Sequence, residues 1–247
     1  MGMLDKIQIS RRMCPVIFLL DTSGSMAGAP IGAVNAAIEG VLPELISMNE
    51  SNADNEIKIA IMTFDFEPKW IAGENDLLTP EELKNTWTDL NADGLTSMGA
   101  AFSELNKKLS VSHGFMKHAT GSVAPVLFLL SDGAPTDDYP SGLQELKKNN
   151  WYKVAARVAI GYGESNDDVL REFTGNSETV LHTNEPSDLK KMIRFVAITS
   201  SKVASTGGKG LVPDDESAAD PDDNTQKTAQ ALQTQGNILN ANPDEDW

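Results

Sequence analysis

Apolar runs of strand length alternate along this chain with longer amphipathic stretches, and this alternation limits the folds that are open to it. The runs are largely continuous, without a polar residue at every second position. Such hydrophobicity is typical of parallel strands that are buried on both faces of a sheet. We therefore expect strands at 16–20, 57–64, 124–130, 154–160 and 179–181.

The stretches between these runs have the spacing of amphipathic helices. Within 33–45, apolar residues recur three and four positions apart, and Pro30 suits a first helical turn. The alternation predicts an α/β fold, with a doubly wound, mostly parallel central sheet and helices on both faces. Trp70 and Ile71 after Pro68 predict one antiparallel edge strand. Helices are expected at 30–48, 97–110, 141–150, 167–173 and 186–203.

The composition changes after residue 203. The stretch 205–247 is polar, acidic and poor in aromatic residues, so it is not expected to bury enough apolar surface to offset the entropy of ordering. We expect one domain at residues 1–204 and a disordered acidic tail at 205–247. Alternatively, residues 228–239 could form a short helix on a partner, because they hold several apolar positions.

The 247 residues carry a formal charge of −16, which makes nucleic acid and anionic membranes poor partners and makes cations and basic protein surfaces better ones. Cys14 has no second cysteine to pair with and is expected to be a buried apolar residue. The three histidines lack the spacing of a Cys/His zinc site. No apolar run reaches the roughly 18 residues of a membrane span, and the run before Asp21 is too short for a signal peptide. We therefore expect a cytoplasmic protein.

Oxygen-bearing side chains follow two of the predicted strands. Asp21 ends the first run and Asp132 follows the run at 124–130, so both carboxylates are expected at the crevice where a doubly wound sheet binds ligands. Ser23 and Ser25 follow Asp21, and Thr96 precedes the helix expected at 97–110. Carboxylates and hydroxyls without sulfur or imidazole form a hard ligand set, which suits Mg²⁺ or Mn²⁺ better than zinc.

The sequence D-T-S-G-S at 21–25 resembles the D-x-S-x-S motif that opens the metal-ion-dependent adhesion site (MIDAS) of von Willebrand factor A (VWA) domains. Thr96 and Asp132 match the family's remaining ligands, and the resemblance covers roughly residues 13 to 203. It implies a Rossmann-like VWA fold and a divalent cation held, directly or through water, by these five residues. It also implies that a Glu or Asp of a partner protein completes the coordination. Such a domain is a protein-binding module and not an enzyme.

Three stretches are also similar to TerY, a bacterial tellurium-resistance branch of the family. This similarity implies a role in a stress-response or phosphorylation-linked assembly. The cysteine-rich zinc module of some members is not found in these 247 residues. The stretches are D-T-S-G-S-M-A-G-A-P-I-G-A-V-N, M-T-F-D and G-Y-G-E-S-N-D-D-V-L-R-E-F-T-G.

Other interpretations of the same residues stay open. Asp21 and the serines could be ordinary turn residues around Gly24, although Thr96 and Asp132 in register argue against this. A metal-dependent hydrolase or phosphatase could use the same ion to activate water, but Ser23 stands where phosphoaspartyl hydrolases have a second acid, and no histidine is placed as a base. The domain could also be a metal-free scaffold.

Three further features are interpreted structurally. G-Y-G-E at 161–164 lacks the remaining residues of a phosphate-binding loop and is expected to end a strand. Asp137 and Asp138 are expected to be solvated loop acids that tune specificity around the site. The three histidines, His113, His118 and His182, are expected at the surface or behind the site.

Overall fold

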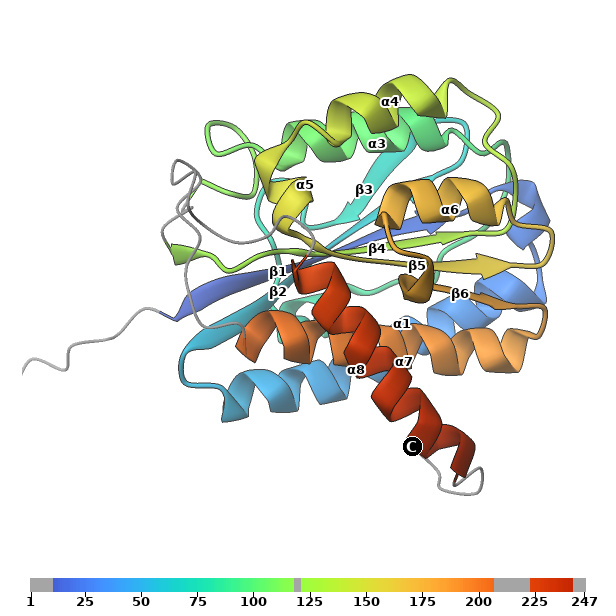
Figure 1. Ribbon diagram of the computed structural model, residues 1–247. Helices are drawn as coiled ribbons and strands as arrows, with labels where there is room; N and C mark the ends of the chain where they lie inside the picture. Colours follow the sequence, from blue (N-terminus) through green and yellow to red (C-terminus); the bar gives the residue numbers. More distant parts are fainter. Residues whose placement is uncertain (1–10, 118–120, 207–222, 242–247) are drawn as a thin grey trace, which may run out of the picture.

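The computed structural model describes residues 11–117, 121–206 and 223–241, and its centre is one six-stranded sheet (Figure 1). The strands are β1 (Arg12–Asp21), β2 (Asn55–Phe64), β3 (Pro68–Ala72), β4 (Val126–Ser131), β5 (Ala156–Tyr162) and β6 (Val180–Thr183). They lie in the order β3-β2-β1-β4-β5-β6. β3 is antiparallel to β2, and the other neighbouring pairs are parallel. The predicted α/β fold with one antiparallel edge strand is therefore confirmed.

The middle of β1 is buried on both faces, as its continuous apolar run predicts. Phe18 and Leu20 belong to one core and Ile17 and Leu19 to the other, because successive side chains of a strand point to opposite faces. Cys14 lies in the same core as Phe18, and burial raises the pKa of its thiol to about 12. Cys14 is thus the buried apolar residue that the sequence predicts.

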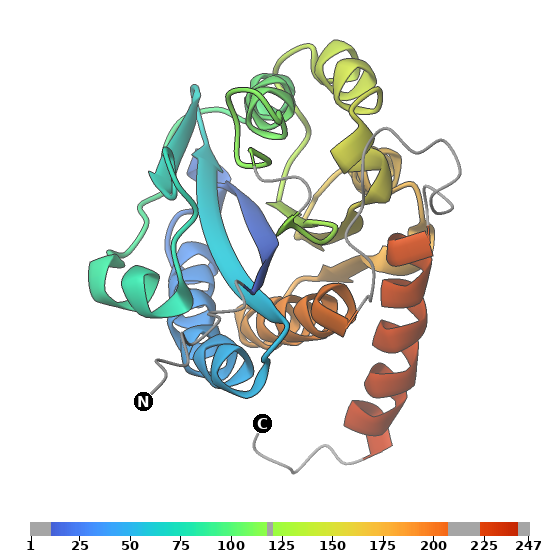
Figure 2. The ribbon, with the colours of Figure 1, turned by 90° about the vertical axis from the view of Figure 1, so that its left-hand side faces the viewer.

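Helices cover both faces of the sheet (Figures 1 and 2). They are α1 (Ala29–Ser51), α2 (Pro80–Thr86), α3 (Met98–Lys108), α4 (Tyr139–Leu146), α5 (Asn150–Val154), α6 (Asp167–Thr174), α7 (Pro186–Thr206) and α8 (Asp223–Ala241). α1 and α7 pack together against one face. Residues of α3, α4, α5 and α6 form the core on the opposite face. The described residues also contain two short 3-10 helices, η1 (Gly24–Met26) and η3 (Ser177–Thr179).

By length and composition alone, α1 could cross a membrane. This was not predicted from the sequence, because only uninterrupted apolar runs were considered. In the fold, 44% of its apolar window is buried inside the domain. Val34, Ile38 and Leu45 belong to the core that the helix shares with α7. α1 is therefore packed as a core helix.

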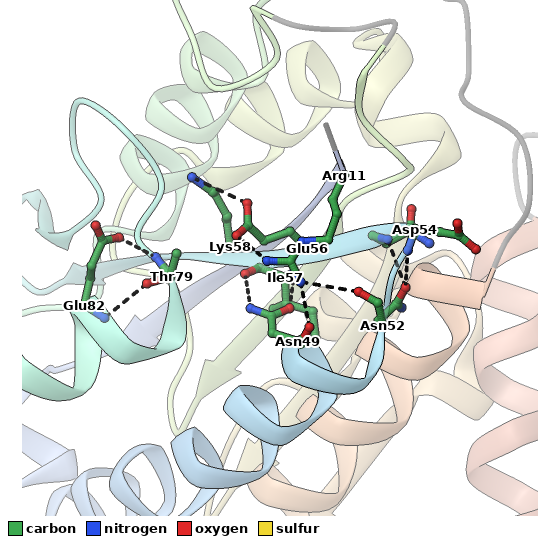
Figure 3. Close-up of polar contacts among 10 residues, drawn as sticks. Arg11, Asn49, Asn52, Asp54, Glu56, Ile57, Lys58, Thr79 and Glu82 are labelled. Atoms are coloured by element: carbon green, nitrogen blue, oxygen red, sulfur yellow. Dashed lines mark hydrogen bonds and ion pairs between the residues drawn. The ribbon is translucent and has the colours of Figure 1, made fainter. Parts of the chain in front are cut away.

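A polar network ties the end of α1 to the start of β2 (Figure 3). The buried Asn49 side chain accepts from Ile57 N at 2.6 Å and donates to Ile57 O at 3.0 Å. Arg11 donates to Asn49 O at 2.6 Å and forms an ion pair with Glu56 at 2.8 Å. This network lies at the amino ends of β1 and β2, the sheet edge opposite Asp21.

α2 is missing from the helices predicted from the sequence. Its capping box is visible in Figure 3: Glu82 N donates to Thr79 Oγ1 at 3.2 Å, and Thr79 N donates to Glu82 Oε2 at 2.8 Å. The backbone hydrogen bond from Thr79 lowers the pKa of Glu82. With seven residues, α2 is too short to show a clear apolar stripe, so only the cap could have revealed it.

The C-terminal helix α8 corrects the prediction of a solvated tail. Asn224 Nδ2 donates to Val154 O at 2.7 Å, and Thr225 Oγ1 donates to Ala155 O at 3.0 Å. The side chains of Ala229 and Leu232 are buried. Small residues at helical spacing thus form a narrow contact stripe on a polar helix, which the average composition hides. The tail prediction is wrong for this helix, which packs on the chain's own domain. Residues 207–222 and 242–247 lie outside the described residues.

Candidate functional site

The candidate site lies where β1 and β4 end side by side. The chain continues from β1 to β2 on one side and returns to β4 on the other, so the strand order changes direction between β1 and β4. Ligands of doubly wound sheets bind at such a switch point. Asp21 is the last residue of β1 and therefore lies at the edge formed by the carboxyl ends of the parallel strands.

Hydrogen bonds hold both carboxylate oxygens of Asp21. Ser23 N donates to Oδ1 at 2.9 Å, and Ser131 Oγ donates to Oδ2 at 2.6 Å. Ser131 reaches Asp21 because β1 and β4 are parallel and Leu20 pairs with Leu130, one position before these two residues. The Asp21 carboxylate is therefore fully buried and fixed in orientation.

Asp132, directly after β4, faces the loop that follows Asp21. Its Oδ1 accepts from Ser25 Oγ at 2.9 Å and from Ser23 Oγ at 3.4 Å. The two serine hydroxyl oxygens are 3.2 Å apart. Ser23 is buried and Ser25 is exposed, so the cluster opens to solvent beside Ser25. Four of the five predicted ligands thus meet in one place.

The loop before α3 brings the fifth residue, Thr96, to the same edge. Asp93 N donates to Thr22 O at 2.8 Å, and Gly24 N donates to Gly94 O at 3.1 Å, so this loop is bonded to the loop after β1. A Cβ added to Gly133 would lie 3.7 Å from Thr96 Oγ1, which puts this hydroxyl next to the residue that follows Asp132.

The two carboxylates of the site are buried without a cationic partner. Burial raises the pKa of Asp21 to about 6, its hydrogen bonds from Ser131 and Ser23 lower it, and the charge of Asp132 raises it further. Burial likewise raises the pKa of Asp132. In the described part of the chain, no lysine or arginine contributes to either shift. Two buried acids of this kind favour a bound cation.

The oxygens present fit a small hard cation. Ser23 Oγ, Ser25 Oγ and Asp132 Oδ1 form a triangle with edges of 2.9, 3.2 and 3.4 Å. Neighbouring ligands of an octahedral Mg²⁺ at about 2.1 Å lie about 3 Å apart. Within the described ranges, no three or more His, Cys, Asp or Glu side chains form a metal cluster. An ion at this site therefore depends on neutral hydroxyls together with two carboxylates.

Two residues that support the site, Ser131 and Thr136, were not predicted as parts of it, and a third, Asp137, was expected beside it but in another role. Ser131 orients Asp21, and Thr136 Oγ1 accepts from Thr96 N at 3.2 Å. Asp137 accepts from Gly99 N and Ala100 N, both at 2.9 Å, at the start of α3.

The prediction that Asp137 is a solvated loop acid is wrong, because its carboxylate caps α3. The helix start offers unpaired backbone N–H groups, and these attract the carboxylate. Asp138 is exposed, as predicted, and its Oδ1 accepts from Ser141 N at 3.4 Å at the start of α4.

The other sequence features lie outside the cluster. β5 ends at Tyr162 within G-Y-G-E, as expected. His182 Nδ1 lies 3.1 Å from Asp167 Oδ1 and 3.3 Å from Ser165 Oγ, and exposed His113 contacts Ser112. Neither of these two histidines hydrogen-bonds to Asp21 or Asp132. His118 lies outside the described residues.

Comparison with known proteins decides the family. The model of the von Willebrand factor type A domain matches residues 16–195, a span that contains all five residues of the cluster. The chain belongs to the VWA family. Domains of this family commonly mediate metal-dependent protein interactions. The comparison with curated proteins finds no match to this chain.

Solved structures share the VWA fold. Proximal thread matrix protein 1 from the mussel byssus, in a structure with a zinc-occupied MIDAS motif, is 17% identical with a TM-score of 0.60, covering 76% of this chain and 48% of that one. The von Willebrand factor type A protein from Catenulispora acidiphila is 17% identical with a TM-score of 0.57, covering 77% and 43%. The vWF domain of the pilus tip protein Mfa5 from Porphyromonas gingivalis is 12% identical with a TM-score of 0.59, covering 82% and 99%. This VWA chain spans about half the length of the mussel protein.

Proposed function

We propose that this VWA domain binds a divalent cation with Asp21, Ser23, Ser25, Thr96 and Asp132 and uses it to capture an acidic side chain of a partner protein. The observation that carries the proposal is the meeting of these oxygens from three separate segments around two buried carboxylates. Family membership supports the same function, because metal-dependent protein interaction is common among VWA domains.

Each part of the cluster has a distinct task. Ser23 N and Ser131 Oγ favour the charged form of Asp21 and orient it, and the serine hydroxyls orient Asp132. A bound divalent cation would balance the two negative charges and offer its remaining position to a carboxylate. The open side at Ser25 leaves room for a Glu or Asp of a partner.

Mg²⁺ or Mn²⁺ is the proposed ion, because the ligands are oxygens only and hard cations prefer such ligands. The zinc in the mussel protein shows which ion that structure holds. The similarity to TerY supports a place in a cytoplasmic tellurium-resistance, stress-response or phosphorylation-linked assembly. The charge of −16 supports a protein partner over nucleic acid or membrane.

Calorimetry tests ion binding. Wild-type protein should bind Mg²⁺ or Mn²⁺ at one site per chain. Asp132→Ala should lose this binding, whereas Asp138→Ala should keep it, because Asp138 is an exposed acid of the same loop. If neither ion gives heat with the wild type, the domain is a metal-free scaffold and the proposal fails.

A pull-down tests capture. A partner held through the ion should be retained by the wild type in Mg²⁺, released by a chelator and absent with Asp132→Ala. Retention that a chelator does not change would contradict the proposal. Turnover of a phosphate ester with Mg²⁺, abolished by Asp21→Ala, would support the hydrolase alternative instead.

A further inference from the structure

Two exposed apolar side chains lie in the loops that build the candidate site. Phe66 is 64% exposed and follows β2, and Leu95 is 52% exposed and directly precedes Thr96. Two other large apolar side chains, Ile71 and Val111, are exposed in the described residues, but neither belongs to the loops of the site. The Phe66 ring lies against Gly94, the residue before Leu95, so the two exposed side chains come from adjoining backbone. Apolar surface exposed next to a polar site can serve as an interaction surface.

Contacts hold the Phe66 side of this surface in place. Ser97 N donates to Asp65 O at 3.0 Å and Ser97 Oγ donates to Phe66 O at 2.9 Å, so the loop after β2 is tied to the start of α3. The Phe66 ring lies against Gly94, since a Cβ added there would be 2.6 Å from Phe66 Cε2. The Phe66 side of the surface is therefore preorganised, which lowers the entropic cost of binding there.

The same contacts connect the ring to the ligand loop. Gly94 O accepts from Gly24 N at 3.1 Å, and Gly24 separates Ser23 from Ser25. A carboxylate that reaches the open side of the cluster at Ser25 would thus bring its flanking residues toward Phe66 and Leu95.

The charges around the site limit the partner further. Glu67, Asp93 and Asp138 are exposed in the same set of loops, on a chain with a charge of −16. Additional carboxylates on a partner would be repelled by these acids. A single acid in an apolar context suits the surface better than an acidic run.

We propose that Phe66 and Leu95 form an apolar rim that selects a partner segment in which one Glu or Asp is flanked by large apolar residues. This inference rests on the proposed function, because the acid itself is held through the cation. The rim supplies the preference for its neighbours, through burial of apolar surface on both sides.

The test uses three short capped peptides with the cores Leu-Glu-Leu, Ser-Glu-Ser and Asp-Glu-Asp, titrated into the full chain with Mg²⁺. The Leu-Glu-Leu peptide should bind about tenfold more tightly than Ser-Glu-Ser, as expected for partial burial of leucine side chains. The Asp-Glu-Asp peptide should bind most weakly. Chelation should abolish the binding of all three.

Variants assign the preference to the rim. Phe66→Ser combined with Leu95→Ser should bind Mg²⁺ as the wild type does and lose the tenfold preference. Leu95→Ser alone, which leaves the ring in place, should lose part of it. Val111→Ser is the matched control: Val111 is 50% exposed beyond the far end of α3, so its replacement should change nothing.

The outcomes separate the two proposals. Binding of all three peptides with equal affinity, or a preference that survives in the double variant, overturns the rim and leaves metal-dependent capture intact. Absence of Mg²⁺ binding, or peptide binding that ignores the chelator, overturns the proposed function and the rim with it.

Discussion

At the scale of single residues, the charge state of Asp21 depends on two segments of the site, the loop after β1 and the end of β4. Burial disfavours its carboxylate, whereas the hydroxyl of Ser131 and the backbone of Ser23 favour it. The balance leaves the pKa of Asp21 raised, so its charged carboxylate is energetically unfavourable without a bound ion. Residues that only hydrogen-bond to Asp21 should therefore affect ion affinity.

Ser131→Ala should weaken Mg²⁺ binding by about tenfold or more, because a hydrogen bond to a charged group contributes about 1.5–3 kcal/mol. The 2.6 Å bond to Asp21 Oδ2 would be lost while the five proposed ligands remain. Titration calorimetry measures the change. Ser141→Ala is the control, since Ser141 is exposed in α4. Equal affinities for Ser131→Ala and wild type would mean that Asp21 needs no support from β4.

At the scale of elements, polar side chains join helices to strands at both edges of the sheet. Asn49 joins α1 to β2 through both backbone groups of Ile57. At the opposite edge, Asp167 at the start of α6 contacts His182 in β6. These contacts hold the helices in register with the strands, so their loss should appear in stability and not in ion binding.

Asn49→Ala should lower the free energy of unfolding by about 2–3 kcal/mol, because it leaves buried polar groups of Ile57 without partners. Chemical denaturation gives this value, and calorimetry should give an unchanged Mg²⁺ affinity, since Asn49 lies at the opposite edge from Asp21. Asn52→Ala would be a poorer comparison because Asn52 caps the following turn. Glu50→Ala, at an exposed neighbour, is the control. A shift in ion affinity with Asn49→Ala would show that the two edges are coupled.

The lowered pKa of Asp167 makes its contribution to the free energy of unfolding depend on pH. Partial burial raises its pKa, but hydrogen bonds from Ser165 and His182 and the charges of His182 and Arg171 lower it by more. The pKa of Asp167 is lower in the folded chain than in the unfolded chain, where it is near 3.9. Its charge therefore stabilises the fold at pH values above about 3.9, and this stabilisation is lost as the pH falls through the pKa of the folded state.

Asp167→Asn should therefore be less stable than wild type at pH 7, by no more than about 1 kcal/mol at this partly exposed position. The difference should shrink when denaturation is repeated near pH 3. Asp168→Asn, which changes a more exposed acid of the same turn, should show a smaller difference at pH 7. A gap between wild type and Asp167→Asn that stayed constant with pH would exclude this account.

At the scale of the whole molecule, the strands could be predicted because short, continuous apolar runs form few structures other than buried strands. The apolar runs of β1 and β4 indicate central strands. Because these strands are parallel neighbours at the switch point, Asp21 and Asp132 lie at the same edge of the sheet. The loop with Thr96 was placed there by its resemblance to a family motif, and hydrogen bonds to Thr22 and Gly24 bring it there.

What escaped prediction depends on contacts between distant segments. Ser131 supports Asp21 only because of the register of β1 against β4, and Asp137 accepts from Gly99 N, 38 residues earlier, at the start of α3. A helix at 228–239 was considered only as a segment that binds a partner. The packing of α8 on its own domain escaped prediction because its buried stripe consists of threonine and alanine with one leucine, so its composition resembles that of a solvated tail. Local patterns carry no sign of such partners.

α8 should behave as part of the domain. Leu232→Ala should lower the free energy of unfolding by about 2 kcal/mol, the lower end for a buried leucine, because the helix packs at the periphery of the core. Gln233→Ala, at the exposed neighbour, should change little, and both variants should keep the Mg²⁺ affinity of the wild type. Hydrogen exchange should show the amides of α8 protected together with those of β5, since Thr225 bridges the two elements. If Leu232→Ala were as stable as Gln233→Ala and α8 exchanged freely, the helix would contribute nothing to the domain, and the chain after α7 would again be a candidate for binding a partner.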